Sequence, residues 1–217
     1  MLEMASHLHR RTERDYFARM NSEKPHCIEV AKLYGEDFWD GERKYGYGGY
    51  LYDGRWESVA RNLIEHYDLG ADAKILDVGC GKGFLLYEFQ KLLSSPKLVG
   101  IDTSSYAIER AKDGLAADLL RRGAQDTYPF DESYFDLVVS IDTLHNLSIG
   151  QLKAALAEVE RVGKNKFILV ESFRNEAELV NLQCWALTCK SFYSPEDWKW
   201  LFAEFGYSGD HEFIYFE

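Results

Sequence analysis

The stretch ILDVGCGKG, residues 75–83, combines an acid with alternating glycines in a way that suits binding of a small charged molecule. An apolar run that predicts a buried strand leads into Gly79, Gly81 and Gly83, and a helical pattern follows. Glycines let backbone amides approach a ligand closely, and the N-terminus of the next helix favours an anionic group. A carboxylate at Asp77 can hold an ammonium group, directly or through water. The stretch therefore predicts a ligand loop between a strand and a helix, and a tight turn without a ligand is the simpler alternative.

A second acid, Asp102, ends the next apolar run, KLVGID. The glycine spacing is G-x-G-x-G, whereas a dinucleotide site needs glycine or alanine at the position of Phe84. An acid after the second strand also occurs in nicotinamide enzymes, so Asp102 alone does not decide the ligand.

Together these motifs resemble those of class I S-adenosylmethionine-dependent methyltransferases, in which acid-x-G-x-G-x-G follows the first strand. In that family an acid at the end of the second strand binds both ribose hydroxyls, and Asp102 stands at that position. A third stretch, GAQDTYPFDESYFDLVVS (residues 123–140), is similar to a segment of the ubiquinone and menaquinone methyltransferase branch. The chain departs from the pattern at Ala124, where the family often has an acid for the adenine amino group. Gln125 or Asp126 would then hold adenine.

The resemblance covers roughly residues 55–172. It implies S-adenosyl-L-methionine as the cofactor, and its motifs specify cofactor and fold but not substrate. The residues implied in cofactor binding are Asp77, Gly79, Cys80, Gly81, Gly83, Asp102, Thr103, Ala124, Gln125 and Asp142.

Candidate catalytic residues follow the fourth and fifth predicted strands. His145, in SIDTLHNL, could remove a proton from the methyl acceptor, with Asn146 facing the substrate; the alternative is that His145 packs or caps a helix. Glu171 could act as a base, and Arg174 could bind a carboxylate or phosphate; a surface ion pair is the alternative for each. His211 is a weaker candidate base. No second carboxylate accompanies Asp142 and Asn146 convincingly, so no metal is expected.

The segment KYGYGGYLYDGRW, residues 44–56, combines aromatic rings with a pliable backbone. Rings can shield a sulfonium, which is attracted to aromatic faces, and can exclude water. Arg55 could pair with the carboxylate of the methionyl group. We expect this loop to close over cofactor and substrate through Tyr47, Tyr50, Tyr52 and Arg55, with ordinary packing as the alternative.

The surrounding pattern predicts the elements that position these residues. Strands are expected at residues 74–79, 97–102, 135–142 and 166–172, with a weak strand near 119–123 and a last one at 211–217. Helices are expected between them, as well as over residues 7–20, 27–39 and 57–69, the last ended by Gly70. This alternation predicts a doubly wound, mostly parallel Rossmann-like α/β sheet, with the ligand crevice at the carboxyl ends of the strands.

Composition restricts the class of protein further. The 217 residues suit one compact unit, divided here into an N-terminal helical cap and lid (residues 1–56) and a methyltransferase domain (residues 57–217). The net charge of −11 argues against a broad nucleic-acid surface. The four cysteines lack zinc or redox spacing, and neither a signal peptide nor a membrane span is expected, so we expect a cytoplasmic protein.

The sequence thus predicts a methyltransferase that acts on a small polar molecule, with a sugar hydroxyl in a biosynthetic pathway as the first expectation. Its partner is a small-molecule substrate, without nucleic acid or membrane. Methylation of an amine or carboxylate, a protein or RNA acceptor, and a non-catalytic protein that binds S-adenosylmethionine are the alternatives.

Overall fold

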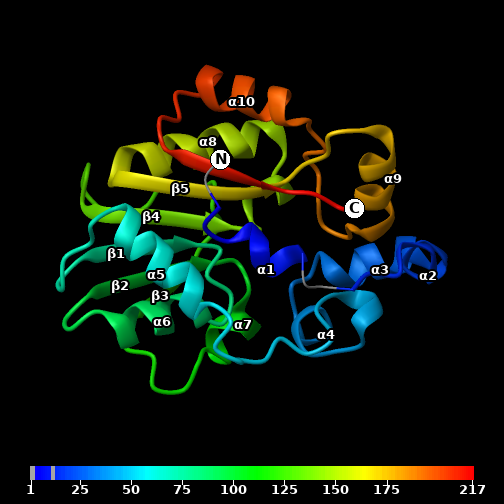
Figure 1. Ribbon diagram of the computed structural model, residues 1–217. Coiled ribbons are helices and arrows are strands. Elements are labelled where there is room, and N and C mark those ends of the chain that lie inside the picture. Colours follow the sequence, from blue (N-terminus) through cyan, green and yellow to red (C-terminus); the bar gives the residue numbers. More distant parts are fainter. Residues whose placement is uncertain (1–2, 11–12) are drawn as a thin grey trace.

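One parallel sheet forms the centre of the molecule, with helices on both of its faces (Figure 1). The computed structural model describes residues 3–10 and 13–217. Its sheet has six strands in the order β3-β2-β1-β4-β5-β6, and each neighbouring pair runs parallel. The strands are β1 (Lys74–Val78), β2 (Lys97–Asp102), β3 (Asp118–Arg121), β4 (Phe135–Ile141), β5 (Gly163–Glu171) and β6 (Asp210–Ile214).

Helices follow most strands and also precede the sheet. Those that flank the sheet are α5 (Glu57–His66), α6 (Phe84–Leu92), α7 (Ser105–Glu109), α8 (Ile149–Val162), α9 (Glu176–Trp185) and α10 (Pro195–Glu204). The N-terminal part consists of α1 (Ser6–Arg10), α2 (Tyr16–Asn21), α3 (Lys24–Ala31), α4 (Glu36–Trp39) and the 3₁₀ turn η1 (Arg43–Tyr45), and a second 3₁₀ turn, η2 (Leu144–Asn146), follows β4. The expected doubly wound fold is therefore confirmed.

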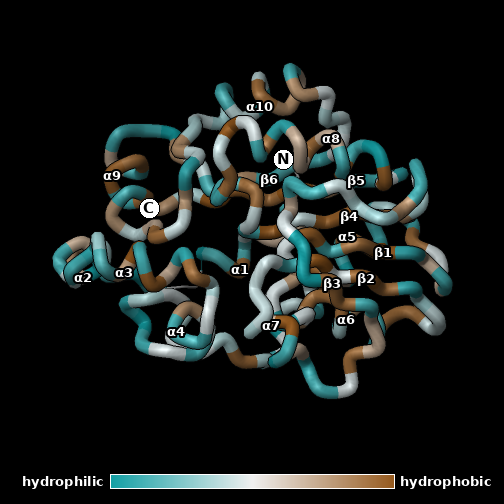
Figure 2. Tube along the Cα trace, turned by 180° about the vertical axis from the view of Figure 1, so that it is seen from behind, coloured by the Kyte–Doolittle hydropathy of each residue, from teal (hydrophilic) through white to brown (hydrophobic). Residues whose placement is uncertain are grey.

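The sheet is buried on both faces because successive side chains of a strand point to opposite sides. Ile75 and Phe167 belong to one apolar cluster, and their neighbours Leu76 and Ile168 belong to the other. Figure 2 shows this as hydrophobic colour along the strands, inside a more polar shell of helices and loops. A sheet covered in this way leaves the carboxyl ends of its strands as the place for a ligand site.

Some boundaries differ from the predicted ones for local reasons. The expected helix over residues 27–39 is divided into α3 and α4, because Tyr34 adopts a left-handed conformation (φ 49°) before Gly35. Helix α5 ends at His66 rather than near Gly70, because Asp68 (φ 48°) turns the chain. The expected helix that begins near Ser104 stops at Glu109.

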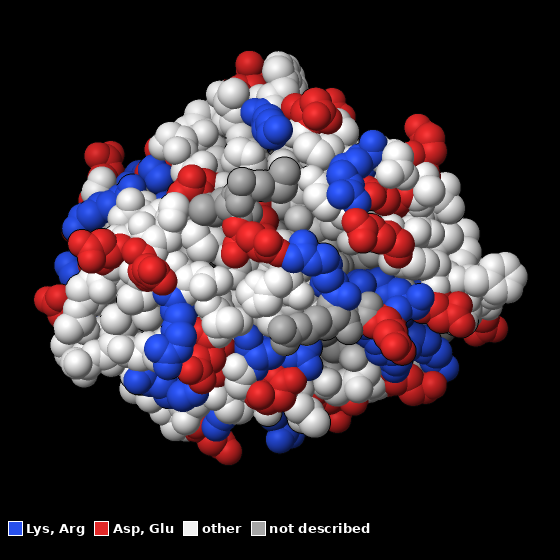
Figure 3. Space-filling view, in the orientation of Figure 1, with Lys and Arg blue, Asp and Glu red and all other residues white. Residues whose placement is uncertain are grey.

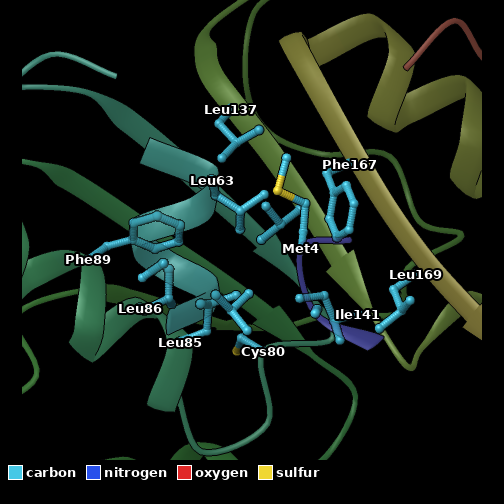
Figure 4. Close-up of a cluster of buried hydrophobic side chains, with 14 of the residues drawn as sticks. Met4, Leu63, Cys80, Leu85, Leu86, Phe89, Leu137, Ile141, Phe167 and Leu169 are labelled. Carbon is cyan, nitrogen blue, oxygen red and sulfur yellow. The ribbon is translucent and has the colours of Figure 1, made fainter. Parts of the chain in front are cut away.

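Hydrogen bonds attach the first described residues to the last strand, β6. The buried carboxylate of Glu212, on β6, accepts hydrogen bonds from the backbone amides of Met4 (3.0 Å), Ala5 (3.0 Å) and Ser6 (3.1 Å). Figure 4 shows Met4 among the side chains of Leu63, Leu137, Phe167 and their neighbours in the core. This contact fixes the start of the N-terminal segment over the sheet.

No helix among the described residues is long and apolar enough to cross a membrane.

The attachment of the N-terminal segment can be tested at Glu212. Glu212→Gln keeps the shape of the side chain but removes a charged acceptor from three backbone amides. We expect the free energy of unfolding, measured in urea, to fall by about 1–3 kcal/mol. The matched control is Glu204→Gln, at an exposed position of α10, which should leave it unchanged. Equal stability of Glu212→Gln and Glu204→Gln would contradict a stabilising role for the hydrogen bonds to Glu212.

Candidate functional site

Two neighbouring cavities lie at the carboxyl ends of the strands. The smaller, of about 280 Å³, is lined by the glycine loop, the end of β2 and the segment after β3. The larger, of about 620 Å³, lies between the strand ends and the N-terminal part of the chain. The side chains that line both cavities are Phe38, Tyr47, Tyr50, Trp56, Phe84, Ile141, Asp142 and Asn146. The two spaces therefore share a mostly aromatic wall.

The smaller cavity contains nine of the ten residues predicted to bind the cofactor. These are Asp77, Gly79, Cys80, Gly81, Asp102, Thr103, Ala124, Gln125 and Asp142. Gly83 is the exception, because it begins α6 behind the loop. Their roles in binding remain predictions, but the fold brings them together.

Asp102 organises the glycine loop. One of its carboxylate oxygens accepts from the amide of Gly81 and the other from the amide of Ser104, each at 2.8 Å. Gly81 has a φ of 53°, and a Cβ atom there would lie 2.8 Å from the ring of Trp39, so the position requires glycine. The N-terminal part of the chain thus packs directly on the loop.

Two acids of the smaller cavity, Asp77 and Asp102, are buried. Burial and the nearby charge of Asp102 raise the pKa of Asp77 to about 8, and burial raises the pKa of Asp102 itself. A ligand that carries an ammonium group would supply a counter-charge to Asp77, and its hydroxyl groups could add to the two backbone hydrogen bonds that Asp102 already accepts. The chemistry of the residues therefore fits S-adenosylmethionine.

The end of the cavity predicted to hold adenine contains Gly123, Ala124 and Gln125. Asp126, the other alternative, is outside the lining and accepts a hydrogen bond from the amide of Gly123 (2.9 Å). The geometry therefore favours Gln125 over Asp126 for this role.

Glu171 and Asp142 are two partly buried carboxyls that line the larger cavity. Burial and the charge of Asp142 raise the pKa of Glu171 to about 8. Burial also raises the pKa of Asp142 to about 7, and the guanidinium of Arg14 partly opposes this. Asp142 has a left-handed backbone (φ 57°), which is unusual for a residue with a side chain. Two acids that titrate near neutral pH in one cavity are suited to proton transfer.

His145 is placed to support Glu171 rather than to act as a base. Its Nδ1 accepts from the backbone amide of Glu171 (3.3 Å), so its proton is on Nε2, which lies 3.4 Å from Glu171 Oε2. Burial lowers the pKa of His145 to about 3. The geometry thus argues against the base role predicted for His145, because the ring is weakly basic and both nitrogens face Glu171.

Polar atoms without partners gather around the larger cavity. His9 Nε2, Arg19 Nε, Asp142 Oδ1, Asn146 Oδ1 and Glu171 Oε2 are buried and lack a hydrogen bond in the described part of the chain. All of these residues line the larger cavity. Buried polar groups are rarely left unpaired, so this concentration distinguishes the walls of the larger cavity from the apolar core.

The aromatic-glycine loop forms the wall between the cavities. Tyr47 stacks on Trp39 (centroids 5.3 Å apart) and contacts Tyr50 (4.5 Å), which stacks on Phe84 (4.9 Å). A Cβ atom at Gly46 would overlap the carbonyl group of Phe38, which explains a glycine between tyrosines. The loop therefore packs closely on its neighbours and also lines the site.

Other predicted substrate residues have different positions. Arg55 lines the larger cavity but pairs with Asp53 (2.6 Å). Tyr52 donates to Glu88 (2.6 Å) and lines neither cavity. Arg174 also lies outside both, paired with Glu178 and Glu217, and so does His211, which packs against Phe202 (5.1 Å) and Phe213 (5.3 Å). The predicted contacts of Tyr52 and Arg174 with substrate are not supported, because each side chain already has partners elsewhere.

The sequence analysis missed several residues of the larger cavity. They are His9, Arg14, Arg19, Arg43, Trp185 and Cys189. They come from α1, α2, η1, α9 and the segments beside them, whose positions over the sheet depend on tertiary contacts. The described residues contain no group of three or more His, Cys, Asp or Glu side chains arranged to hold a metal ion.

The central part of the chain is similar to a known domain family. Residues 75–166 match a family model described as a methyltransferase domain. An uncharacterized methyltransferase of Synechocystis sp. is 32% identical over 113 residues, which cover 51% of this chain and 52% of that protein. A mitochondrial arginine-hydroxylase of Mus musculus is 28% identical over 130 residues, which cover 59% of this chain and 37% of the relative. The chain thus spans about half, or less, of the length of these curated relatives.

The fold extends beyond that domain. A chain from the complex of the Haloferax volcanii Trm112 methyltransferase activator with a putative methyltransferase superposes with a TM-score of 0.59. The identity is 17%, and the match covers 90% of this chain and 77% of the other. The fold is that of a Rossmann-like class I methyltransferase, and the match to a methyltransferase domain agrees with S-adenosylmethionine as the cofactor.

Removal of the Asp102 carboxylate tests the cofactor cavity. Asp102→Ala takes away the predicted acceptors for the ribose hydroxyls. Binding of S-adenosylhomocysteine, measured by calorimetry, should weaken about 10- to 100-fold, since hydrogen bonds to a charged group contribute about 1.5–3 kcal/mol. Asp118→Asn, at an exposed position of β3, is the control and should bind normally. Unchanged affinity of a folded Asp102→Ala variant would refute this role.

The raised pKa of Glu171 predicts a pH-dependent stability. Because the pKa is about 8 in the folded protein and about 4.3 in an unfolded chain, the folded state holds this proton more tightly. The stabilisation is complete below about pH 4 and is lost as the pH rises to about 8. The free energy of unfolding should therefore fall less steeply between about pH 5 and 8 in Glu171→Gln than in the wild type. Exposed Glu65→Gln should retain the wild-type slope, and equal slopes in all three proteins would contradict the burial of an acid at position 171.

Proposed function

We propose that this chain transfers a methyl group from S-adenosylmethionine to an oxygen or nitrogen of a small molecule held in the larger cavity. The observation that carries the proposal is the cavity itself, with its unpartnered polar atoms and its shared wall with the cofactor cavity. When bound, S-adenosylmethionine supplies an electrophilic methyl group on a sulfonium. Tyr47 and Tyr50 line both spaces and would exclude water at the junction.

Glu171 is the base in this proposal. Its pKa of about 8 is close to a physiological pH, where a general base works best, and Glu171 lies in the wall of the larger cavity. Glu171 accepts the proton that the acceptor loses on methylation. His145 positions the carboxyl through the backbone amide of Glu171 and through the contact from Nε2. Asn146, whose Oδ1 lacks a partner, would accept a hydrogen bond from the substrate.

A small acceptor fits better than a polymer. The larger cavity is lined by the N-terminal segment, the aromatic-glycine loop, the ends of β4 and β5 and the segment after α9, so walls from four parts of the chain surround it. Its volume of about 620 Å³ lies in the range of small-molecule sites. A hydroxyl of a polar metabolite, such as a sugar, remains our first proposal for the nucleophile, with an amine as the second.

The test must follow the methyl group as well as binding, since a relative over the same stretch carries the name arginine-hydroxylase. The protein is incubated with methyl-labelled S-adenosylmethionine and pools of nucleotide sugars and other metabolites, and labelled products are identified by mass spectrometry. Labelled product that depends on the protein supports the proposal. Binding of S-adenosylhomocysteine without any labelled product would favour a non-catalytic protein, and tighter binding of NAD would contradict the cofactor.

With the acceptor found, Glu171→Gln should lower turnover by about 10²- to 10⁴-fold, the usual contribution of a general base. Its affinity for S-adenosylhomocysteine should stay the same. Because the base must be ionised, wild-type turnover should rise with pH and level off above about 8. His145→Gln should cost less, since His145 only positions Glu171. A larger loss in His145→Gln than in Glu171→Gln would overturn this assignment.

A further inference from the structure

Three arginines surround one aromatic ring in the larger cavity. The guanidinium carbons of Arg14, Arg19 and Arg43 lie 5.6, 4.5 and 4.9 Å from the centre of the Trp185 ring. All four residues line the larger cavity, and none of them lines the smaller one. We call these arginines and Trp185 the arginine cluster. Figure 1 shows how it arises, because α2 and α3 lie beside α9.

The cluster brings like charges together in a partly dry place. Burial lowers the pKa of each arginine, that of Arg19 to about 10, and repulsion from Arg14 contributes to the lowering at Arg43. Stacking on Trp185 and hydrogen bonds from Arg19 to the carbonyls of Arg43 (2.7 Å) and Lys44 (2.7 Å) offset part of this cost. An anion between the guanidiniums would offset it more fully.

Carboxylates of the protein do not fill that role at Arg19 and Arg43. None of the ion pairs between residues 3–10 and 13–217 involves either of them. In the same cavity, Asp53 is paired with Arg55, and the pKa values of Asp142 and Glu171 are raised to about 7 and 8. The end of the larger cavity that contains the arginine cluster is therefore cationic, although the whole chain carries a net charge of −11.

On the face of the molecule shown in Figure 3, Lys and Arg side chains alternate with Asp and Glu side chains, and acids lie beside the basic groups near its centre. The local excess of positive charge is inside the cavity, where a lower dielectric strengthens it and salt screens it less.

The rest of the larger cavity is aromatic and apolar. Phe38, Tyr47, Tyr50, Trp56 and Phe84 line it towards the cofactor side. A ligand that matches the whole space has an anionic group at one end, a flat or apolar body, and a nucleophile at the end where Glu171 lies.

We propose that the arginine cluster binds an oxyanion, a carboxylate or a phosphate, carried by the methyl acceptor at the end remote from the methylated atom. This inference rests on the proposed function and narrows its substrate class. Guanidinium groups pair with either oxyanion through two parallel hydrogen bonds. Arg43 is exposed and lines the cavity, and its guanidinium donates to the carbonyl of Gly46. The anion anchors the acceptor, and the methylated atom lies at the wall shared by both cavities, to which the cluster contributes no residue.

Three simple probes test this proposal by calorimetry in the presence of S-adenosylhomocysteine. Phenyl phosphate and benzoate carry the two candidate anions, and benzamide is the neutral analogue of benzoate. We expect at least one anion to bind more than tenfold more tightly than benzamide, and inorganic phosphate to compete with it. Comparison of phenyl phosphate with benzoate then identifies the oxyanion. Binding of benzamide as tight as both anions, or no binding of either anion, would overturn the proposal.

Variants of Arg43 test whether the arginine cluster causes the preference for anionic probes over benzamide. Arg43→Gln should remove most of the tenfold preference for the anion, and Arg43→Lys, which keeps the charge, should retain part of it. Arg121→Gln, at an exposed position of β3, is the matched control and should behave as the wild type. Thermal unfolding confirms that each variant is folded. An unchanged preference in folded Arg43→Gln would assign the anion elsewhere and contradict the cluster.

The same samples separate this inference from the proposed function. If S-adenosylhomocysteine binds and the anion preference is absent, only the anionic acceptor is wrong. If S-adenosylhomocysteine does not bind to the wild type, the methyltransferase proposal itself fails.

Discussion

The site depends on acids that the fold holds at one edge of the sheet with little water around them. Asp77 lies on β1, Asp102 ends β2, Asp142 follows β4 and Glu171 ends β5. Parallel strands bring their carboxyl ends to the same edge, so these acids must share one region. Burial raises the pKa of each. The free protein therefore bears an electrostatic cost there, and a ligand with cationic or hydrogen-donating groups recovers it on binding.

The N-terminal part of the chain excludes water from these acids. Acids with raised pKa values require exclusion of water, and the strand ends alone would leave them open to solvent. Trp39 packs on Gly81, and the adjoining rings of Tyr47, Tyr50 and Phe84 extend this cover. Glu212 holds Met4 and the residues after it to β6. The cover and the catalytic edge are thus one structure, although their residues are far apart in sequence.

The features that depend on short stretches of sequence could be predicted. The strands β1, β2, β4 and β5 were predicted from their apolar runs, and the cofactor cavity from the glycines and acids at their ends, because topology alone brings strand ends together. The left-handed turns at Tyr34 and Asp68 were missed, since a residue with a side chain at positive φ leaves no clear sign in one sequence. The arginine cluster was missed for a different reason. Its arginines are more than 100 residues from Trp185 in the sequence, and only the packing of α2 against α9 brings Arg19 to Trp185.

The two ends of the larger cavity are electrically coupled through Arg14. Its guanidinium stacks on Trp185 at the outer end and lowers the pKa of both Asp142 and Glu171 at the inner end. An anion bound at the cluster would offset part of this positive charge. The pKa values of Asp142 and Glu171 would then rise, so that Glu171 becomes a stronger base once ionised but is ionised only at higher pH. An anionic acceptor should therefore shift the pH at which turnover levels off upwards, relative to a neutral acceptor, and the direction follows from Coulomb's law alone.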